Sequence, residues 1–332
     1  MKFLRILLWF TVVWTFCLAM LGAYVRLSDA GLGCPDWPGC YGRITPPEQQ
    51  HEIAHAEKHF GGEVDPAKGW KEMVHRYCVG GLSLLLLAAL ILTARHRREL
   101  NVNVPMLLAP VAVIVFQALL GMWTVTLKLM PIVVTSHLIG GLTLLATITL
   151  IASRASLSQQ ALSGRSWVWL ALVVVIAQIV LGGWVSSNYA GLACDGFPAC
   201  RGSFAPPPGL LDALHPDRQL GLTASGAPLT IDHLAAIHWL HRLGALVVLA
   251  VVGGLAWRLR RIQPRWAKLL GLALVVQLTL GIVNAVYSLP LPAAVAHNGG
   301  AGLLVVLLTA LLASTRSENT DAQSHAQYSF AR

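Results

Sequence analysis

Charged residues are scarce in this chain of 332 residues. Asp, Glu, Lys and Arg make up only 12% of the sequence, hydrophobic residues reach 55%, and the mean hydropathy is +0.63. So little charge leaves no stretch from which a soluble domain of useful size could be built. It also excludes the basic soluble surface that nucleic-acid binding requires. The composition predicts an all-α membrane protein that crosses the bilayer several times.

Aspartates are also few, and they are scattered along the chain. An enzyme that transfers a prenyl group needs clustered aspartates on helices to hold Mg²⁺ and pyrophosphate, and no such cluster is present. The six cysteines do not supply four ligands at metal-binding spacing in either half, so a zinc site is not expected. These absences make a polyprenyltransferase or a zinc protein a poor interpretation.

Long apolar runs are what the chain has in abundance. About twenty apolar residues span a bilayer as a helix. Eight segments of roughly this length are predicted to do so, at 6–25, 73–94, 105–127, 131–151, 167–186, 233–257, 266–287 and 293–314. One further helix is expected outside them, over 48–60.

The two halves of the chain repeat each other. Residues 22–40 correspond to 182–200 at an offset of 160. The same offset relates Gln117 to Gln277, Gly121 to Gly281 and His137 to His297, and the His-Arg pairs His75-Arg76 and His241-Arg242 lie 166 apart. Four helices in each repeat predict two four-helix bundles related by a pseudo-twofold axis along the membrane normal. The repeats are expected at 1–155 and 156–315, with 316–332 a disordered tail.

The distribution of basic residues predicts the orientation. With the N-terminus inside, the cytoplasmic segments hold 14 of the 24 Lys and Arg residues but only three of the 15 acidic ones. Both termini are therefore expected in the cytoplasm. The first apolar run resembles a signal peptide, but its counterpart precedes Gly182, so it is expected to be retained as a helix.

Each long outer loop contains one pair of cysteines with five residues between them. On an oxidising face of the membrane these pairs predict the disulfides Cys34–Cys40 and Cys194–Cys200, either as structural staples or as redox-active dithiols. Cys17 and Cys78 lie in apolar helices and are expected to be reduced and buried.

Histidines within the apolar helices are the strongest indication of function, because ionisable groups at membrane depth are costly. His75, His137, His241 and His297 all fall near the outer ends of their helices. Two neutral imidazoles facing each other across a bundle can hold a haem iron axially. Small residues three and four positions after three of these histidines are expected to leave room for the macrocycle. The alternative is helix packing with hydrogen-bonded histidines.

Neighbouring residues refine this prediction. Arg76 and Arg242 follow two of the histidines and could pair with haem propionates, or extend to lipid headgroups. Glu72 lies one turn before His75, where it could act as an acid or base or stabilise a developing cation. The alternative for Glu72 is a solvated residue at a helix N-terminus. His238 occupies the matching place in the second half. His51, His55 and His59 share a helix face and could bind a metal, although a solvated helix is favoured.

The sequence resembles the haem A synthase family over residues 1–315. The resemblance depends on Gly-Leu-Gly-Cys-Pro-Asp-Trp-Pro-x-Cys, on Glu72-x-x-His75-Arg76 and on a second half that repeats the scheme. It implies an oxidoreductase that converts a methyl group of haem O to a formyl group by successive hydroxylations in a bacterial inner membrane. It implies that the catalytic residue is Glu72, that the substrate-haem ligands are His75 and His137, and that the haem b ligands are His241 and His297.

The resemblance also implies partners. These are haem O as substrate, haem O synthase in the same membrane and an electron donor or acceptor, and a homo-oligomer is compatible with it. Whether oxygen comes from water or dioxygen stays open. The alternative function is a bis-histidine cytochrome that takes electrons from quinol, which would leave Glu72 without a task. A transporter built from a duplicated bundle would not explain the two His-Arg pairs.

Overall fold

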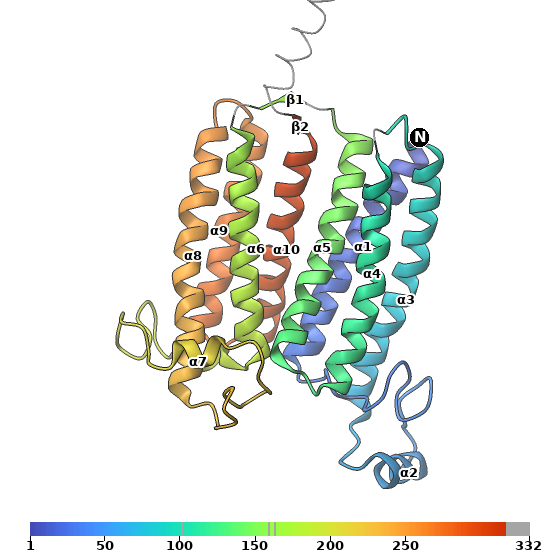
Figure 1. Ribbon diagram of the computed structural model, residues 1–332, viewed down its shortest axis with the longest axis vertical. Coiled ribbons are helices and arrows are strands. Elements are labelled where there is room, and N and C mark those ends of the chain that lie inside the picture. The colour runs from blue at the N-terminus through green and yellow to red at the C-terminus, as the bar shows by residue number, and fades with distance from the viewer. Residues whose placement is uncertain (101, 159, 163, 317–332) are drawn as a thin grey trace, which may run out of the picture.

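Two groups of helices stand side by side in the computed structural model (Figure 1). The structure describes residues 1–316 except Asn101, Gln159 and Ser163. Within these residues, eight helices are long and apolar enough to cross a membrane. They are α1 (Lys2–Leu27), α3 (Pro66–Arg95), α4 (Val104–Thr126), α5 (Pro131–Ser156), α6 (Arg165–Ser187), α8 (Ile231–Leu259), α9 (Pro264–Val286) and α10 (Leu291–Ala313).

The eight predicted spans are confirmed, with one informative difference at α3. This helix begins at Pro66 rather than at residue 73. The Asp65 carboxylate accepts hydrogen bonds from the backbone N–H groups of Ala67 and Lys68, and Pro66 fits the first helical position because it needs no N–H partner there. Glu72 therefore lies in the second turn of α3 and not at its N-terminus.

Shorter elements occupy the connections. They are α2 (Gln50–Phe60), a 3₁₀ helix η1 (Ala190–Leu192), α7 (Leu210–Leu214), and the strands β1 (Gln160–Ala161) and β2 (Thr315–Arg316). The helix expected over 48–60 is thus confirmed as α2. β1 and β2 pair in parallel at the end of the bundle that carries the N-terminus. The predicted tail lies outside the described residues, apart from Arg316.

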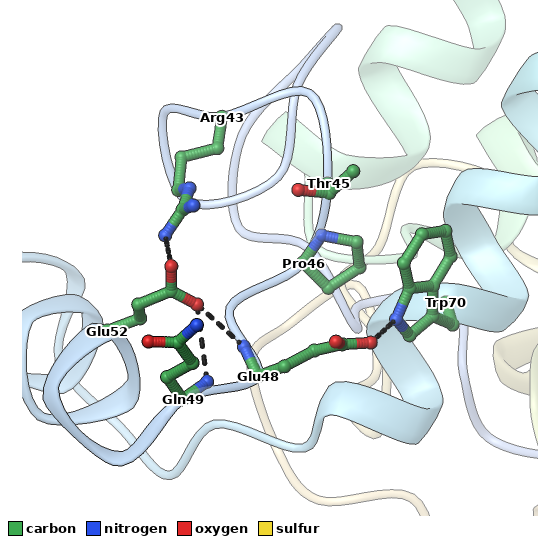
Figure 2. Close-up of a pocket in the computed structure, with 7 residues that line it drawn as sticks. All are labelled: Arg43, Thr45, Pro46, Glu48, Gln49, Glu52 and Trp70. Carbon is green, nitrogen blue, oxygen red and sulfur yellow. Dashed lines mark hydrogen bonds and ion pairs between the residues drawn. The ribbon is translucent and has the colours of Figure 1, made fainter.

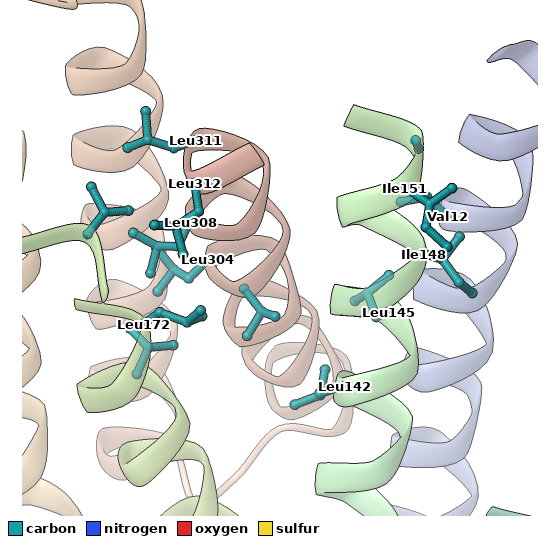
Figure 3. Packing of buried hydrophobic residues seen from close by; sticks show 14 of the residues in the cluster. Val12, Leu142, Leu145, Ile148, Ile151, Leu172, Leu304, Leu308, Leu311 and Leu312 are labelled. Carbon is teal, nitrogen blue, oxygen red and sulfur yellow. The ribbon is translucent and has the colours of Figure 1, made fainter. Parts of the chain in front are cut away.

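The core lies among the four inner helices α1, α5, α6 and α10. α5 contacts α1, α6 and α10, and α10 also contacts α1 and α6. Buried aliphatic side chains fill this region, among them Leu145, Ile148, Leu304 and Leu308 (Figure 3). The outer helices α3, α4, α8 and α9 expose many large apolar side chains, as expected for surfaces in contact with lipid.

The cysteine loops, 28–65 and 188–230, lie at the opposite end from β1 and β2 (Figure 1). We call this the cysteine-loop end. Both disulfides are formed, so the predicted pairing Cys34–Cys40 and Cys194–Cys200 is confirmed. Cys17 and Cys78 are free as expected. The expected burial is wrong for both, because Cys17 is exposed on α1 and Cys78 is only half-buried on α3.

Candidate active site

Four histidines lie in the helices that begin at the cysteine-loop end. His75 is on α3, His137 on α5, His241 on α8 and His297 on α10, each within about the first three turns of its helix. His75 and His137 lie close enough to interact electrostatically, and so do His241 and His297. The fold thus brings the histidines together in two pairs.

The second pair has dimensions that suit one metal ion. The ring centroids of His241 and His297 are 6.5 Å apart, and their planes are inclined at 79°. A nitrogen of imidazole binds a transition metal at about 2 Å, and the ring centroid lies roughly 1 Å behind it, so two axial imidazoles place their centroids about 6 Å apart. The observed separation therefore fits two axial ligands on one haem iron.

Each of the four rings lies against a glycine of the neighbouring helix. A Cβ atom on Gly182 would lie 3.0 Å from the Cε1 atom of His241, and one on Gly22 would lie 3.1 Å from that of His75. Gly281 and Gly121 take the same place beside His297 and His137. A larger residue at Gly22, Gly182 or Gly281 would press on the ring, whereas at Gly121 the nearest ring atom, 3.6 Å away, would be in ordinary contact.

Three glutamines fill space that the sequence was expected to leave open. The Nε2 of Gln117 donates a hydrogen bond of 2.9 Å to the carbonyl of His137, and the Nε2 of Gln178 donates one of 2.8 Å to that of His241. The Nε2 of Gln277 lies 3.4 Å from the Nε2 of His297. A Cβ atom on Gly140, Gly244 or Gly300 would overlap the Oε1 of one of these glutamines. The expectation of an open face at these three glycines is therefore wrong.

Glu72 joins α3 to the first cysteine loop. Its side chain is buried, with 6% of its surface exposed. One carboxylate oxygen accepts a hydrogen bond of 3.0 Å from the backbone N–H of Cys34, and the other accepts one of 2.5 Å from Arg76. The alternative of a solvated residue at a helix N-terminus is wrong. Glu72 is a buried carboxylate held on both oxygens.

The two arginines bind the cysteine loops. The Nη1 atom of Arg76 donates to the carbonyls of Asp36 and Pro38 at 3.1 Å, and to that of Gly39. Arg242 donates to Cys194 at 2.7 Å, to Gly196 at 2.8 Å and to Ala199 at 3.0 Å. The Nε atom of Arg242 is buried and has no partner, so one donor is left for a ligand.

At the same end, hydrogen bonds connect residues of the two helix groups. Arg26 donates a hydrogen bond of 2.6 Å to the carbonyl of Ser186 and lies over the ring of Tyr189. The Tyr189 hydroxyl donates to Asp29 at 3.0 Å, and Lys68 pairs with the same carboxylate at 2.9 Å. The hydrogen bond from Lys68 is the main reason that the pKa of Asp29 is lowered.

The three histidines of α2, His51, His55 and His59, have exposed side chains. The rings of His55 and His59 lie 4.0 Å apart, but no group of three or more His, Cys, Asp or Glu converges within the described part of the chain. The solvated-helix interpretation is therefore favoured. His238, at the place that matches Glu72, is buried, and its Nδ1 has no partner.

An open pocket of about 220 Å³ lies beside α2 and is not lined by any of the four histidines (Figure 2 shows its lining). Arg43 pairs with Glu52 at 2.6 Å, and the indole N–H of Trp70 donates to Glu48 at 2.5 Å. The pKa of Glu52 falls to about 2, because its carboxylate accepts the backbone N–H of Glu48 and is paired with Arg43. These contacts stabilise the loop and assign no ligand to the pocket.

The sequence interpretation singled out Glu72, the four histidines and the two arginines, and the fold places all of them at the cysteine-loop end. It gave no role to the glutamines. A signal for two of them was present, because Gln117 and Gln277 are related by the repeat offset. Gln178 could be found only once α6 was known to lie against α8.

Comparison with known proteins adds an independent line of argument. The COX15-CtaA family model, described as cytochrome oxidase assembly protein, matches residues 5–310. The chain is 44% identical over 321 residues to the heme A synthase of Shewanella oneidensis, covering 92% of this chain and 94% of the relative. It is 29% identical over 341 residues to the heme A synthase of Chelativorans sp. (strain BNC1), covering 94% and 91% of the two chains.

Proposed function

This chain belongs to the COX15-CtaA family of cytochrome oxidase assembly proteins, and on that premise we propose that it is a haem A synthase. It is then a multi-pass membrane oxidoreductase whose substrate is haem O. The observation that carries the proposal is the 44% identity along almost the whole length of a heme A synthase. The buried Glu72 beside the first histidine pair supplies a chemical reason for it.

The proposed reaction turns a peripheral methyl group of haem O into a formyl group. Two successive two-electron oxidations each add one hydroxyl group, and the geminal diol then loses water. The oxygen atoms come from water or dioxygen. With water, an electron acceptor must take up two electrons in each step; with dioxygen, an electron donor must supply two electrons in each step, and the second oxygen atom leaves as water. The protein supplies orientation and electrostatics around this chemistry.

The two histidine pairs are proposed to hold different haems. His75 and His137 would bind the substrate haem, and His241 and His297 would ligate a resident haem b. The ring separation in the second pair supports axial ligation of one iron. Haem b would supply one-electron transfer to or from the substrate site.

Glu72 is the proposed catalytic residue. A carboxylate that is buried and held by Cys34 and Arg76 has a fixed direction, and its charge is screened little by water. It can stabilise positive charge that develops at the methyl carbon, or accept a proton from an attacking water. No equivalent negative charge exists at His238.

The two arginines are proposed to hold the cysteine loops in place and to bind the haem propionates. Arg76 and Arg242 brace the cysteine loops above the histidines, and the free Nε of Arg242 leaves a donor for a propionate. For Arg76 to bind a propionate, it must give up one of its hydrogen bonds to a loop carbonyl or share that donor with the propionate. The disulfides would keep each loop closed over its haem.

The predicted pseudo-twofold arrangement has support within the chain. The bonded pairs Arg26–Ser186 and Asp29–Tyr189 are each separated by 160 residues, the repeat offset. Non-glycine residues with positive φ also occur in pairs at this offset, namely Asp29 and Tyr189, Tyr41 and Arg201, Lys128 and Ser288, and Leu129 and Leu289. We therefore propose repeats at 1–155 and 156–315, with an axis that passes near Arg26 and Ser186.

The proposed location is the inner membrane of a bacterium. Both termini would be cytoplasmic, as the basic residues predict, and the cysteine loops would face the oxidising periplasm, where disulfides persist. The proposed partners are haem O synthase in the same membrane and an unidentified electron donor or acceptor. A second copy of the chain is compatible with the exposed apolar helices.

Expression in a bacterium that makes haem O but lacks its own haem A synthase tests the proposal. Haem extracted from the membranes is identified by mass. The expected product is haem A. Accumulation of haem O alone, with folded protein present in the membrane, would refute the activity and favour an electron-transferring cytochrome.

A further inference from the structure

Three of the four histidines, His137, His241 and His297, have a glutamine at the same relative position on the neighbouring helix, and His75 does not. Gln117, Gln178 and Gln277 each stand four residues before the glycine that touches a histidine ring, at Gly121, Gly182 and Gly281. On the partner helix, the third residue after the histidine is a glycine, at Gly140, Gly244 and Gly300. We call this second glycine the notch, because a Cβ atom there would lie 2.1–2.2 Å from the Oε1 of the glutamine and the amide would have to move.

His75 has neither part of this arrangement. Gly22 touches its ring, but the residue four positions earlier is Leu18, and the third residue after His75 is Cys78. The glutamine and its notch are thus missing together. Among the described residues, the Nδ1 atoms of His75 and His137 are both buried without a hydrogen-bond partner. His137 differs in that the Gln117 amide donates a hydrogen bond to its backbone carbonyl, and His75 has no such glutamine.

The chemistry of axial ligation explains why this matters. A histidine that binds a metal through one nitrogen donates the N–H of the other to a second group, which fixes the tautomer and the ring orientation. The Nδ1 of His297 lies 3.2 Å from the carbonyl of Gln277, to which it can donate, and this would leave Nε2 as the nitrogen available to a metal once the Gln277 amide, 3.4 Å from it, moves aside. The Gln178 amide lies 3.0 Å from the Nδ1 of His241.

The amide oxygens of the three glutamines are available to accept a hydrogen bond. The Oε1 atoms of Gln117, Gln178 and Gln277 are all buried without a hydrogen-bond partner. Turning the Gln178 amide by half a rotation would place its Oε1 near the Nδ1 of His241, where it can accept the N–H of a metal-bound imidazole. A leucine at this position can offer no such acceptor.

We propose that Gln117, Gln178 and Gln277 are positioning residues for three axial histidines, and that His75 is the exchangeable ligand of the substrate haem. This inference rests on the proposed function, since only a haem that must enter and leave benefits from one unrestrained ligand. The resident haem b is held by two restrained histidines. The substrate haem is held by His137, whose backbone carbonyl is bonded by the Gln117 amide, and by His75, which lacks a glutamine and is free to move away.

The test measures how fast haem leaves the purified full-length protein to an excess of a haem-scavenging apoprotein, together with the low-spin ferric EPR signal. Gln178→Leu should speed the loss of haem b by about 10–100-fold and broaden or shift its low-spin signal. Gln117→Leu is the matched control, because it alters the other half and should leave haem b loss unchanged.

The converse variant adds the missing arrangement to the first half. Leu18→Gln combined with Cys78→Gly should slow the loss of haem O by about tenfold or more and raise its low-spin fraction. A misfolded protein could not produce this gain. Cys78→Gly alone controls for the notch without the amide and should not slow the loss.

Two results would overturn the inference: wild-type loss of haem b from Gln178→Leu, or unchanged or faster loss of haem O from the double variant. If the double variant does not fold, the rate of haem b loss from Gln178→Leu alone decides whether the inference stands. The proposed function fails separately. Finding haem B in both halves would refute the substrate assignment, while the loss rates would still report on the glutamines.

Discussion

Helices α3 and α8 carry the same His-Arg pair, yet they present different groups around it. On α3, one turn before His75, the Glu72 carboxylate is held by Cys34 and Arg76. On α8, the imidazole of His238 takes that place. Arg242, with no carboxylate there, donates a hydrogen bond to the carbonyl of Cys194. One site has a buried carboxylate and no glutamine beside its helix-α3 histidine, and the other has a glutamine beside its histidine and no carboxylate. On the proposed function, this difference would separate the site of chemistry from the site that retains a cofactor.

The largest effect is expected at the carboxylate. Glu72→Gln keeps the size and hydrogen-bonding capacity of the side chain but removes its charge, so haem A production should fall roughly 100-fold or more. The fold and haem b content should be retained. The measurement is the ratio of haem A to haem O in membranes, by mass.

His238→Gln is the matched control for this variant. It changes the corresponding position of α8 and should leave haem A production within about threefold of wild type, since no charge is lost there. Near-normal production by Glu72→Gln, or an equal loss in both variants, would contradict the comparison.

The cysteine loops should show the next largest effect. In the chain-entropy model a short disulfide loop contributes up to about 3 kcal/mol. Replacing Cys194 and Cys200 with serine should lower haem b retention, while the haem that remains keeps its normal spectrum. Replacing Cys34 and Cys40 should lower turnover and spare haem b, because that loop holds Glu72. Normal haem content with failed turnover in the Cys194 and Cys200 variant would instead indicate a redox relay.

A smaller effect is expected where the helix groups meet. Asp29→Asn removes the ion pair with Lys68 and weakens the bond from Tyr189, which should reduce stability by about 1 kcal/mol. The pKa of Asp29 is lowered in the folded protein, so its contribution is present above the unfolded pKa and is lost as the pH falls through the folded value. Thermal unfolding in detergent as a function of pH measures both. An unchanged pH dependence in Asp29→Asn would count against this role.

The smallest effect is expected at the pocket beside α2. Glu52→Gln should leave haem content and haem A production within about twofold of wild type, because the pocket is not lined by His75, His137, His241 or His297. In wild type the Arg43–Glu52 pair should persist until the pH falls from about 4.5 towards about 2. Chemical shifts of the Glu52 carboxylate would show this, and titration near 4.5 would be inconsistent with it.

Much of the fold follows from local signals in the sequence. Apolar length predicts the spans, and cysteine spacing within one loop predicts the disulfides, because both depend on neighbouring residues. Glu72 and His75 could be placed on one face because they share a helix. The start of α3 was missed because Asp65 and Pro66, which cap it, precede the apolar run.

Features that depend on which helices meet could not be predicted. The glycines after the histidines were expected to face open space, but α4, α6 and α9 insert Gln117, Gln178 and Gln277 there. The exposure of Cys17 likewise depends on which side of α1 faces the bundle. The pairing of β1 with β2 joins segments far apart in the sequence that carry no strand pattern.

The most direct test of the two-haem account is the pigment content of His75→Ala and His241→Ala proteins purified in parallel, with each haem identified by mass and by its low-spin signal. The account predicts that His241→Ala loses haem B, while His75→Ala keeps haem B with its low-spin signal and produces no haem A. Loss of the same haem from both variants, or full retention of the haem b signal in His241→Ala, would contradict the assignment of chemistry to one half and cofactor to the other.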